Sequence, residues 1–144
     1  MKFAICNEVF EGWTIDDSIR FVAEAGYNAI EIAPFTLAQY VTEVPVVERQ
    51  RIRAVAADNG IGISGVHWVL IKTEGMYMTH TDPEVRRKTA EYFCELVNFC
   101  ADLGGEAIVV GSPNQRNLLP DVSFEQAWEL ARATFAPAIR LAEE

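Results

Sequence analysis

The feature that most constrains the fold of this chain is a pattern that occurs four times along it. A short, continuous apolar run is followed each time by a longer stretch in which apolar residues recur with helical spacing. The apolar runs do not alternate with polar residues, which is typical of parallel strands that are covered on both faces. They occupy residues 2–7, 28–34, 61–70 and 107–113. The sequence therefore predicts an α/β fold of four parallel βα units.

Helix-start signals support this division. Thr14 and Ser123 stand where helix caps are expected, each followed three residues later by a side chain that can complete a capping box. The second helix is predicted over residues 46–59, and the third begins at Asp82, which proline follows. Pro137 is expected to bend the fourth helix. The apolar residues of that helix recur about every 3.6 positions: Phe124, Trp128, Ala131, Phe135, Ile139 and Ala142.

Two architectures are built from repeated βα units, the open doubly wound sheet and the eight-fold barrel. A nucleotide-binding open sheet usually has a glycine-rich first turn, whereas the first turn here reads CNEVFEGW. We therefore predict half of a TIM (β/α)8 barrel, with residues 1–144 forming a single N-terminal domain. The chain ends in LAEE, which places negative charge at the negative end of a helix dipole. We expect the fold to continue beyond residue 144, so that the C-terminal half of the barrel is absent from this chain.

Composition excludes several classes of partner. The formal charge of −9 disfavours nucleic acid, whose binding requires a basic face. No apolar run approaches the roughly 20 residues that span a bilayer, and the N-terminus lacks a secretory signal. The three cysteines show no metal-type spacing and are predicted to be inert, reduced thiols. The chain is expected to be cytoplasmic, without a membrane or nucleic-acid partner.

Five short motifs follow one another in order: ICNE, IEIAPF, GVHWVL, HTDPEVR and VVGSPNQRNL. Together they make the sequence resemble the sugar phosphate isomerase/epimerase family, also described as xylose isomerase-like TIM barrels and related to the AP endonucleases of family 2. The resemblance extends over essentially the whole chain. It implies a barrel of roughly twice this length that binds a divalent metal (Mn, Mg, Co or Zn) and moves a proton beside a sugar carbonyl.

The same resemblance assigns no catalytic residue and no metal ligand to this chain. In the better-known members the ligands lie on strands five to eight, and the first of two proton-shuttling glutamates ends the strand after the fourth helix. We therefore expect the metal ligands beyond residue 144 and predict that the isolated chain is inactive. No local spacing typical of metal ligands is present within the chain itself.

The run GVHWVL ends the third predicted strand with His67 and Trp68. Barrel enzymes place their chemistry at the carboxyl ends of the strands. An indole can lie against the apolar face of a sugar there, and an imidazole can hydrogen-bond a hydroxyl group. Because strand neighbours point in opposite directions, His67 is expected to face the barrel centre and Trp68 to lie at the rim. The alternative is a histidine whose hydrogen bonds are satisfied within the core.

Glu31 stands inside the apolar run AIEIAP, where an unpartnered carboxylate is costly. We interpret it as a pocket-facing acid that orients substrate hydroxyls, with a structural bond to a neighbouring group as the alternative. Asn7 and Glu8 follow the first strand and either line the same rim or cap the loop.

The segment GSPNQRN places Ser112, Gln115 and Arg116 after the fourth strand. A guanidinium can bind phosphate or carboxylate through two hydrogen bonds, and an amide suits a polyol. The alternative is an ordinary polar loop.

The preferred interpretation is therefore the N-terminal part of a metal-dependent sugar or sugar phosphate isomerase/epimerase, with a small sugar or sugar phosphate as its partner. Which sugar is used, and whether it carries phosphate, stays open. A second hypothesis is a self-associating half-barrel that acts as a binding or assembly module, because four parallel strands leave two open edges. A DNA-acting relative of the AP endonucleases is disfavoured by the acidic charge.

Overall fold

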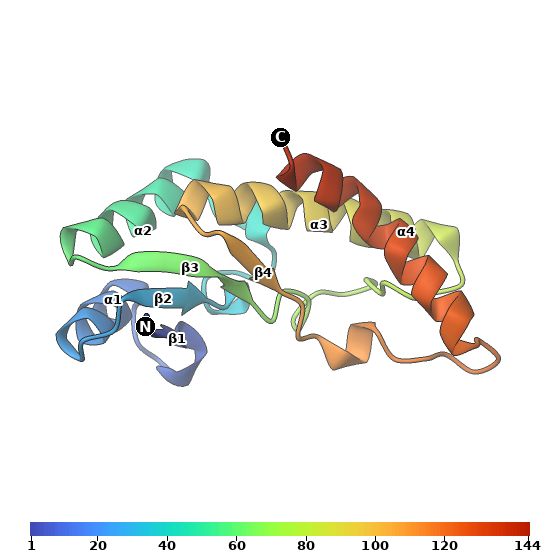
Figure 1. Ribbon diagram of the computed structural model, residues 1–144, viewed down its shortest axis with the longest axis horizontal. Helices are drawn as coiled ribbons and strands as arrows, with labels where there is room; N and C mark the ends of the chain where they lie inside the picture. Colours follow the sequence, from blue (N-terminus) through green and yellow to red (C-terminus); the bar gives the residue numbers. More distant parts are fainter.

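The computed structural model describes residues 1–144 and contains one sheet of four parallel strands in the order β1-β2-β3-β4 (Figure 1). The strands are β1 (Ala4–Cys6), β2 (Ala29–Ile32), β3 (Gly62–His67) and β4 (Ala107–Val109). Each is followed by a helix: α1 (Ile15–Glu24), α2 (Val46–Asp58), α3 (Pro83–Leu103) and α4 (Phe124–Ala142). The predicted α/β class and its four βα units are confirmed.

The predicted helix starts are confirmed. The Thr14 hydroxyl accepts a hydrogen bond from the Asp17 amide at 3.1 Å, and Asp82 caps α3 through the Glu84 amide at 2.8 Å. Ser123 forms the predicted capping box at the start of α4. The fourth strand is shorter than the predicted 107–113, because the chain leaves the sheet after Val109 and forms a 3₁₀ turn at residues 113–115.

The hydrophobic core lies between the sheet and the middle helices. Ile30 and Val66 of the sheet are fully buried, as are Ile52 of α2 and Leu96 and Phe99 of α3. Burying each such side chain stabilises the fold by roughly 1.5–3 kcal/mol. None of the four helices combines the length and the hydrophobicity that a membrane-spanning segment requires. The core thus fixes the two central strands most firmly, and these strands carry the main candidate site residues.

A buried arginine ties α2 to the segment that precedes it. The Arg49 guanidinium donates hydrogen bonds to the carbonyl oxygens of Val44 and Val41 at 2.8 and 3.0 Å, and to the Asp102 carboxylate of α3 at 3.0 Å. It also lies 5.2 Å from the ring centroid of Phe99. The loop after β2 is thereby joined to two helices through one side chain.

The last unit is packed less completely than the middle ones. The helix α4 packs on α3, where the rings of Phe135 and Phe93 lie 4.6 Å apart (Figure 1). Three other members of the apolar stripe predicted from the sequence, Phe124, Trp128 and Ile139, are exposed. Between α3, β4 and the end of α4 a cavity of about 230 Å³ remains, lined mostly by apolar residues.

Candidate functional site

A bulge in the central strand pair places Glu31 and His67 on the same face of the sheet. The register between β2 and β3 shifts between Ile30 and Glu31, so that Glu31 lies opposite Gly65. Side chains alternate along a strand, and His67, two residues after Gly65, therefore points to the same side as Glu31. Without the shift, Glu31 would lie opposite Ser64 and His67 would point to the other face.

The two side chains meet at the carboxyl ends of their strands. The Nδ1 atom of His67 lies 3.5 Å from Oε2 of Glu31, and the two side chains keep 28% and 24% of their surface exposed. The pair is therefore neither sealed in the core nor freely solvated. A carboxylate can accept hydrogen bonds from substrate hydroxyl groups, and an imidazole can accept one or donate one.

Trp68 leaves the strand in a left-handed backbone conformation, with φ of 59°. Its indole N–H donates a 2.7 Å hydrogen bond to the carbonyl oxygen of Gly111, and its amide donates to Val109 at 3.2 Å. The ring lies 6.1 Å from Phe35 and 6.3 Å from His67, measured between centroids. These bonds hold the indole across the ends of β3 and β4 and compensate an unfavourable backbone conformation.

A cavity of about 550 Å³ opens beside this tryptophan. Glu8, Phe35 and Trp68 line it from the ends of the first three strands, together with Phe10, Glu11, Gly12, Trp13 and Thr36. Oε2 of Glu8 is buried and has no hydrogen-bond partner. An unpartnered buried acceptor is rare in proteins.

The aromatic lining of this cavity was only partly predicted. Trp68 was a candidate, whereas Phe35 and the aromatic residues of the β1–α1 loop, Phe10 and Trp13, were not. Phe35 directly follows Pro34 at the end of the second apolar run, and that position was the available signal. The loop residues carry no comparable signal, because their place depends on how the loop folds back toward β2.

Asn7 and Ser112 are buried and bonded within the protein. The Asn7 amide group donates to Thr36 at 2.8 Å and accepts from the Ala33 amide at 2.8 Å. The Ser112 hydroxyl accepts from the Leu70 amide at 3.0 Å and is fully buried. In this structure both side chains fix the loops that surround the strand ends.

Gln115 and Arg116 lie on the loop between β4 and α4. The carbonyl oxygen of Gln115 accepts a hydrogen bond from the Met78 amide at 2.9 Å, which joins this loop to the one that follows β3. Arg116 is exposed and forms no ion pair. Its guanidinium is therefore available to bind an anion.

The Cys6 thiol ends β1 beside this site. Burial raises its pKa from the ordinary value of 9.0 to about 11, and the negative charges of Glu8 and Glu31 add to the effect. At pH 8 we expect the Cys6 thiol to react with iodoacetamide about 100-fold more slowly than in the urea-unfolded chain, because the thiolate fraction is about 100-fold smaller.

Peptide mass spectrometry over a time course measures this rate for each cysteine separately. The folded chain also holds a proton that the unfolded chain releases, so Cys6 favours folding below pH 9 and this contribution declines as pH rises toward 11. Equal rates of Cys6 alkylation in the folded and unfolded chains would contradict this assignment.

The residues of this chain do not form a metal centre. No three His, Cys, Asp or Glu side chains gather closely enough to hold an ion. Glu31 and His67 supply two donors, whereas structural and catalytic sites in proteins use three or more. The divalent metal implied by the sequence resemblance therefore does not fit the side chains present here.

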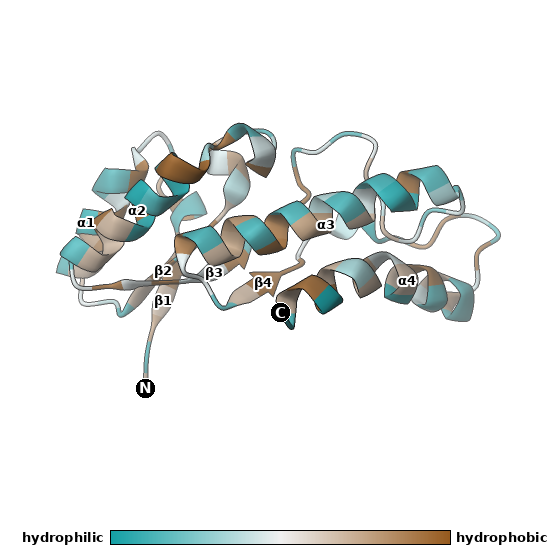
Figure 2. Cartoon of the chain, turned by 90° about the horizontal axis from the view of Figure 1, so that it is seen from above, coloured by the Kyte–Doolittle hydropathy of each residue, from teal (hydrophilic) through white to brown (hydrophobic).

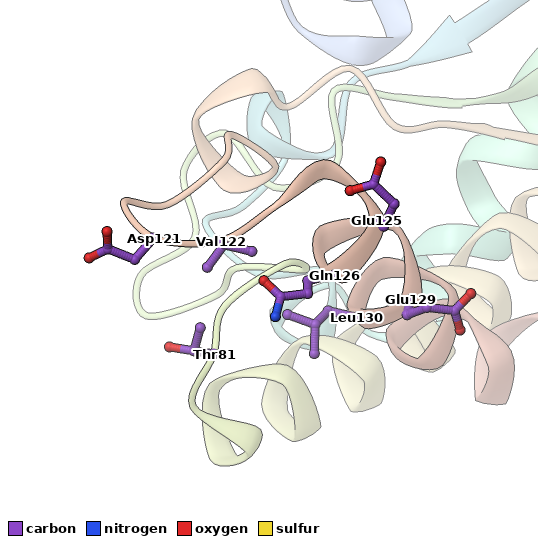
Figure 3. Close-up of a pocket in the computed structure, with 7 residues that line it drawn as sticks. All are labelled: Thr81, Asp121, Val122, Glu125, Gln126, Glu129 and Leu130. Atoms are coloured by element: carbon purple, nitrogen blue, oxygen red, sulfur yellow. The ribbon is translucent and has the colours of Figure 1, made fainter.

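A second cavity of similar volume, about 550 Å³, lies away from the strand ends. Figure 3 shows that four of its lining residues, Glu125, Gln126, Glu129 and Leu130, come from the first turns of α4, with Thr81 on the loop before α3. It contains none of the strand-end candidates. We therefore place the candidate site at the carboxyl ends of β2 and β3. The Glu31–His67 pair lies there next to Trp68, although neither Glu31 nor His67 lines the cavity beside that tryptophan.

The family model described as xylose isomerase-like TIM barrel matches residues 19–144. The chain belongs to this family. The resemblance to sugar phosphate isomerases and epimerases predicted from the sequence is thus confirmed, and the four βα units correspond to half of a TIM barrel. No curated protein sequence matches the chain.

Solved structures of sugar epimerases share the fold of this family member. D-psicose 3-epimerase from Clostridium cellulolyticum H10, solved with D-tagatose, has a TM-score of 0.78 and 19% identity over 99% of this chain and 49% of its own. A D-psicose 3-epimerase solved in the presence of D-fructose has a TM-score of 0.76 and 21% identity, over 99% of this chain and 50% of its own. An L-ribulose 3-epimerase has a TM-score of 0.75 and 18% identity, over 99% of this chain and 46% of its own. The chain spans about half the length of these structures.

Proposed function

We propose that this chain forms the substrate-recognition part of a sugar or sugar phosphate isomerase/epimerase. The observation that carries the proposal is the Glu31–His67 pair, which the bulge places at the ends of adjacent parallel strands. Barrel enzymes bind their substrates at this end of the sheet. The structural relatives, which include epimerases solved with ketoses, support a small sugar as the ligand class.

Each group at the site has a role suited to a polyol. Glu31 and His67 bind adjacent substrate hydroxyl groups, and Glu8 lines the cavity next to them. Trp68 and Phe35 present ring faces to the apolar side of the sugar. If the substrate carries phosphate, Arg116 is the unpaired cation after β4 that binds it.

The proton transfer that defines such enzymes is not assigned to these residues. Abstraction of a proton beside a carbonyl requires a positioned base and stabilisation of the enediolate. Residues 1–144 offer no metal cluster that could stabilise this charge. We propose that the chain alone binds sugar without epimerising it, and that any metal is held by residues outside it.

Binding is tested by calorimetric titration of the chain with D-fructose and D-tagatose. Glu31→Gln and His67→Gln are each expected to weaken ketose binding at least about 10-fold, because glutamine lacks the carboxylate charge of Glu31 and does not place a donor or acceptor where the His67 ring does. Glu24→Gln on the exposed face of α1 and His80→Gln, at the only other histidine, are the matched controls and should bind as the original chain does.

Circular dichroism of each variant separates loss of binding from loss of folding. Ketose affinity that is the same in all four folded variants contradicts the proposed recognition site. Ketose epimerisation by the isolated chain, detected as solvent deuterium incorporated beside the carbonyl, contradicts the proposed division between binding and catalysis.

A further inference from the structure

Gly111 lies where the chain leaves the sheet, beside two side chains of the candidate site. It follows the last residue of β4 by two positions, and Figure 2 shows the hydrophobic strand β4 next to β3, with which it pairs. Glycine has no side chain that could contact a ligand. Any role of Gly111 in the site must therefore come from its backbone or from the space that it leaves empty.

An added side chain at residue 111 would meet both rings at the end of β3. An alanine Cβ there would lie 3.0 Å from Cδ1 and 3.4 Å from Nε1 of Trp68, and 3.7 Å from Cε1 of His67. The first distance is shorter than the roughly 3.5–4.0 Å that is optimal between two carbon atoms. Gly111 does not have a positive φ, so the lack of space favours glycine here, rather than the backbone conformation.

The backbone at Gly111 is held on both sides. Its amide donates a 3.1 Å hydrogen bond to the carbonyl oxygen of Val109, and Val109 pairs with His67 of β3. The next residue, Ser112, is fully buried, and its hydroxyl accepts a 3.0 Å hydrogen bond from the Leu70 amide. Because these bonds anchor both neighbours of residue 111, we expect the rings, rather than the backbone, to give way to an added Cβ.

Gly111 also holds the indole of Trp68 directly. The carbonyl oxygen of Gly111 accepts a 2.7 Å hydrogen bond from the indole N–H. Moving the ring away from residue 111 would strain this bond. It would also change the place of a ring that lines the cavity together with Phe35. Gly111 thus fixes the indole in two ways, through its carbonyl oxygen and through its missing Cβ.

The imidazole of His67 is linked to residue 111 through the same indole. The 3.7 Å contact to Cε1 is unstrained, but the centroid of the Trp68 ring lies 6.3 Å from that of the imidazole. Cε1 is covalently bonded to Nδ1, and Nδ1 lies 3.5 Å from Oε2 of Glu31. A displaced indole is therefore expected to change the spacing of the Glu31–His67 pair.

We propose that Gly111 is a positioning residue of the sugar site. By leaving the volume of one methyl group empty, it sets where the Trp68 indole and the His67 imidazole lie. This role rests on the proposed function, because these two rings are the proposed sugar contacts. Recognition groups have to be held within about 0.5 Å of their productive positions, which is the scale of the shift that relieves a 3.0 Å contact.

NMR spectroscopy and calorimetry of Gly111→Ala test this role. In the ligand-free chain, the substitution should shift the indole N–H signal of Trp68 and the Cε1–H signal of His67. The signals of the other two tryptophans and of His80 should stay in place. The dissociation constant for D-fructose should rise at least about 10-fold, because the two rings no longer lie where the ligand meets them. Gly62→Ala is the matched control, since an added Cβ there meets no atom within 4 Å, and it should leave the signals and the constant unchanged.

A double variant tests whether the indole is the group that residue 111 accommodates. In the original chain, Gly111→Ala should lower the midpoint of urea unfolding. In a Trp68→Ala background the indole is gone, so adding Gly111→Ala should leave the midpoint where Trp68→Ala alone puts it. An equal loss in both backgrounds overturns the proposal. This comparison also decides the question if Gly111→Ala alone does not fold.

Fructose titration distinguishes failure of this role from failure of the proposed function. If the original chain binds D-fructose and Gly111→Ala binds it equally well, the positioning role is overturned and the proposed function stands. Unshifted Trp68 and His67 signals in Gly111→Ala overturn the positioning role as well. If the original chain binds no ketose, the proposed function is contradicted, and the positioning role falls with it.

Discussion

Replacing Gly65 with alanine is expected to destabilise the chain by about 3–5 kcal/mol. Gly65 has φ of 156°, and an added Cβ would lie 2.0 Å from the carbonyl oxygen of Ala107 and 2.8 Å from its carbonyl carbon. Both are backbone atoms of the paired strand β4, so no side chain can rotate to make room. Removing the clash requires β3 and β4 to separate.

Gly62 provides the matched control on the same strand. An added Cβ there meets no atom within 4 Å, and its φ is not in the left-handed region. Gly62→Ala should therefore change the free energy of unfolding by less than about 1 kcal/mol. Urea unfolding followed by circular dichroism compares the two variants. Similar urea midpoints for Gly65→Ala and Gly62→Ala would show that the close approach of β3 and β4 does not limit the side chain at residue 65.

The Gly65 substitution also bears on the site. Gly65 lies at the shifted register that puts Glu31 and His67 on one face. If Gly65→Ala remains folded in part, the altered register should separate these two side chains. We then expect ketose binding to be lost even under conditions in which the variant keeps its helix content.

Replacing Arg49 with methionine is expected to cost about 3 kcal/mol of stability. The methionine can fill the volume, but the carbonyl oxygens of Val41 and Val44 lose their buried donors and Asp102 loses its cation. Buried acceptors without partners carry the full cost of their desolvation. The cation above the Phe99 ring is lost as well.

Arg51 lies on the same helix and serves as the exposed counterpart of the buried Arg49. It binds both Asp16 and Glu48, yet its side chain is 42% exposed. Because solvent screens such pairs, Arg51→Met should cost only about 0–1 kcal/mol. A larger loss for Arg51→Met than for Arg49→Met, measured by urea unfolding, would show that the number of ion pairs matters more than burial.

The sequence was sufficient to predict the architecture because its signals are local. Continuous apolar runs indicated parallel strands, and Thr14, Asp82 and Ser123 marked the helix starts that the structure contains. The predicted half of a TIM barrel also implies strands in sequential order, and the structure has the order β1-β2-β3-β4. The five motifs were sufficient to identify the family.

The geometry of the candidate site could not be predicted in the same way. Residue types indicated Glu31 and His67, but alternation along regular strands gives no reason for them to share a face. The register shift that pairs Glu31 with Gly65 places the two side chains on one face. This shift depends on contacts between neighbouring strands, which a single sequence does not reveal. The burial of Asn7 and Ser112 depends on loops that are distant in sequence. The roles of these candidates in sugar binding stay predictions.

The central claim is that the carboxyl ends of the strands recognise a sugar, and a ¹H–¹⁵N NMR titration of the chain with D-fructose tests it most directly. The account predicts saturable shifts confined to the amides around Glu8, Glu31–Phe35, His67–Trp68 and Gln115–Arg116. Shifts centred instead on the cavity beside α4, at Thr81 and residues 121–130, or no saturable shift at all, would contradict it.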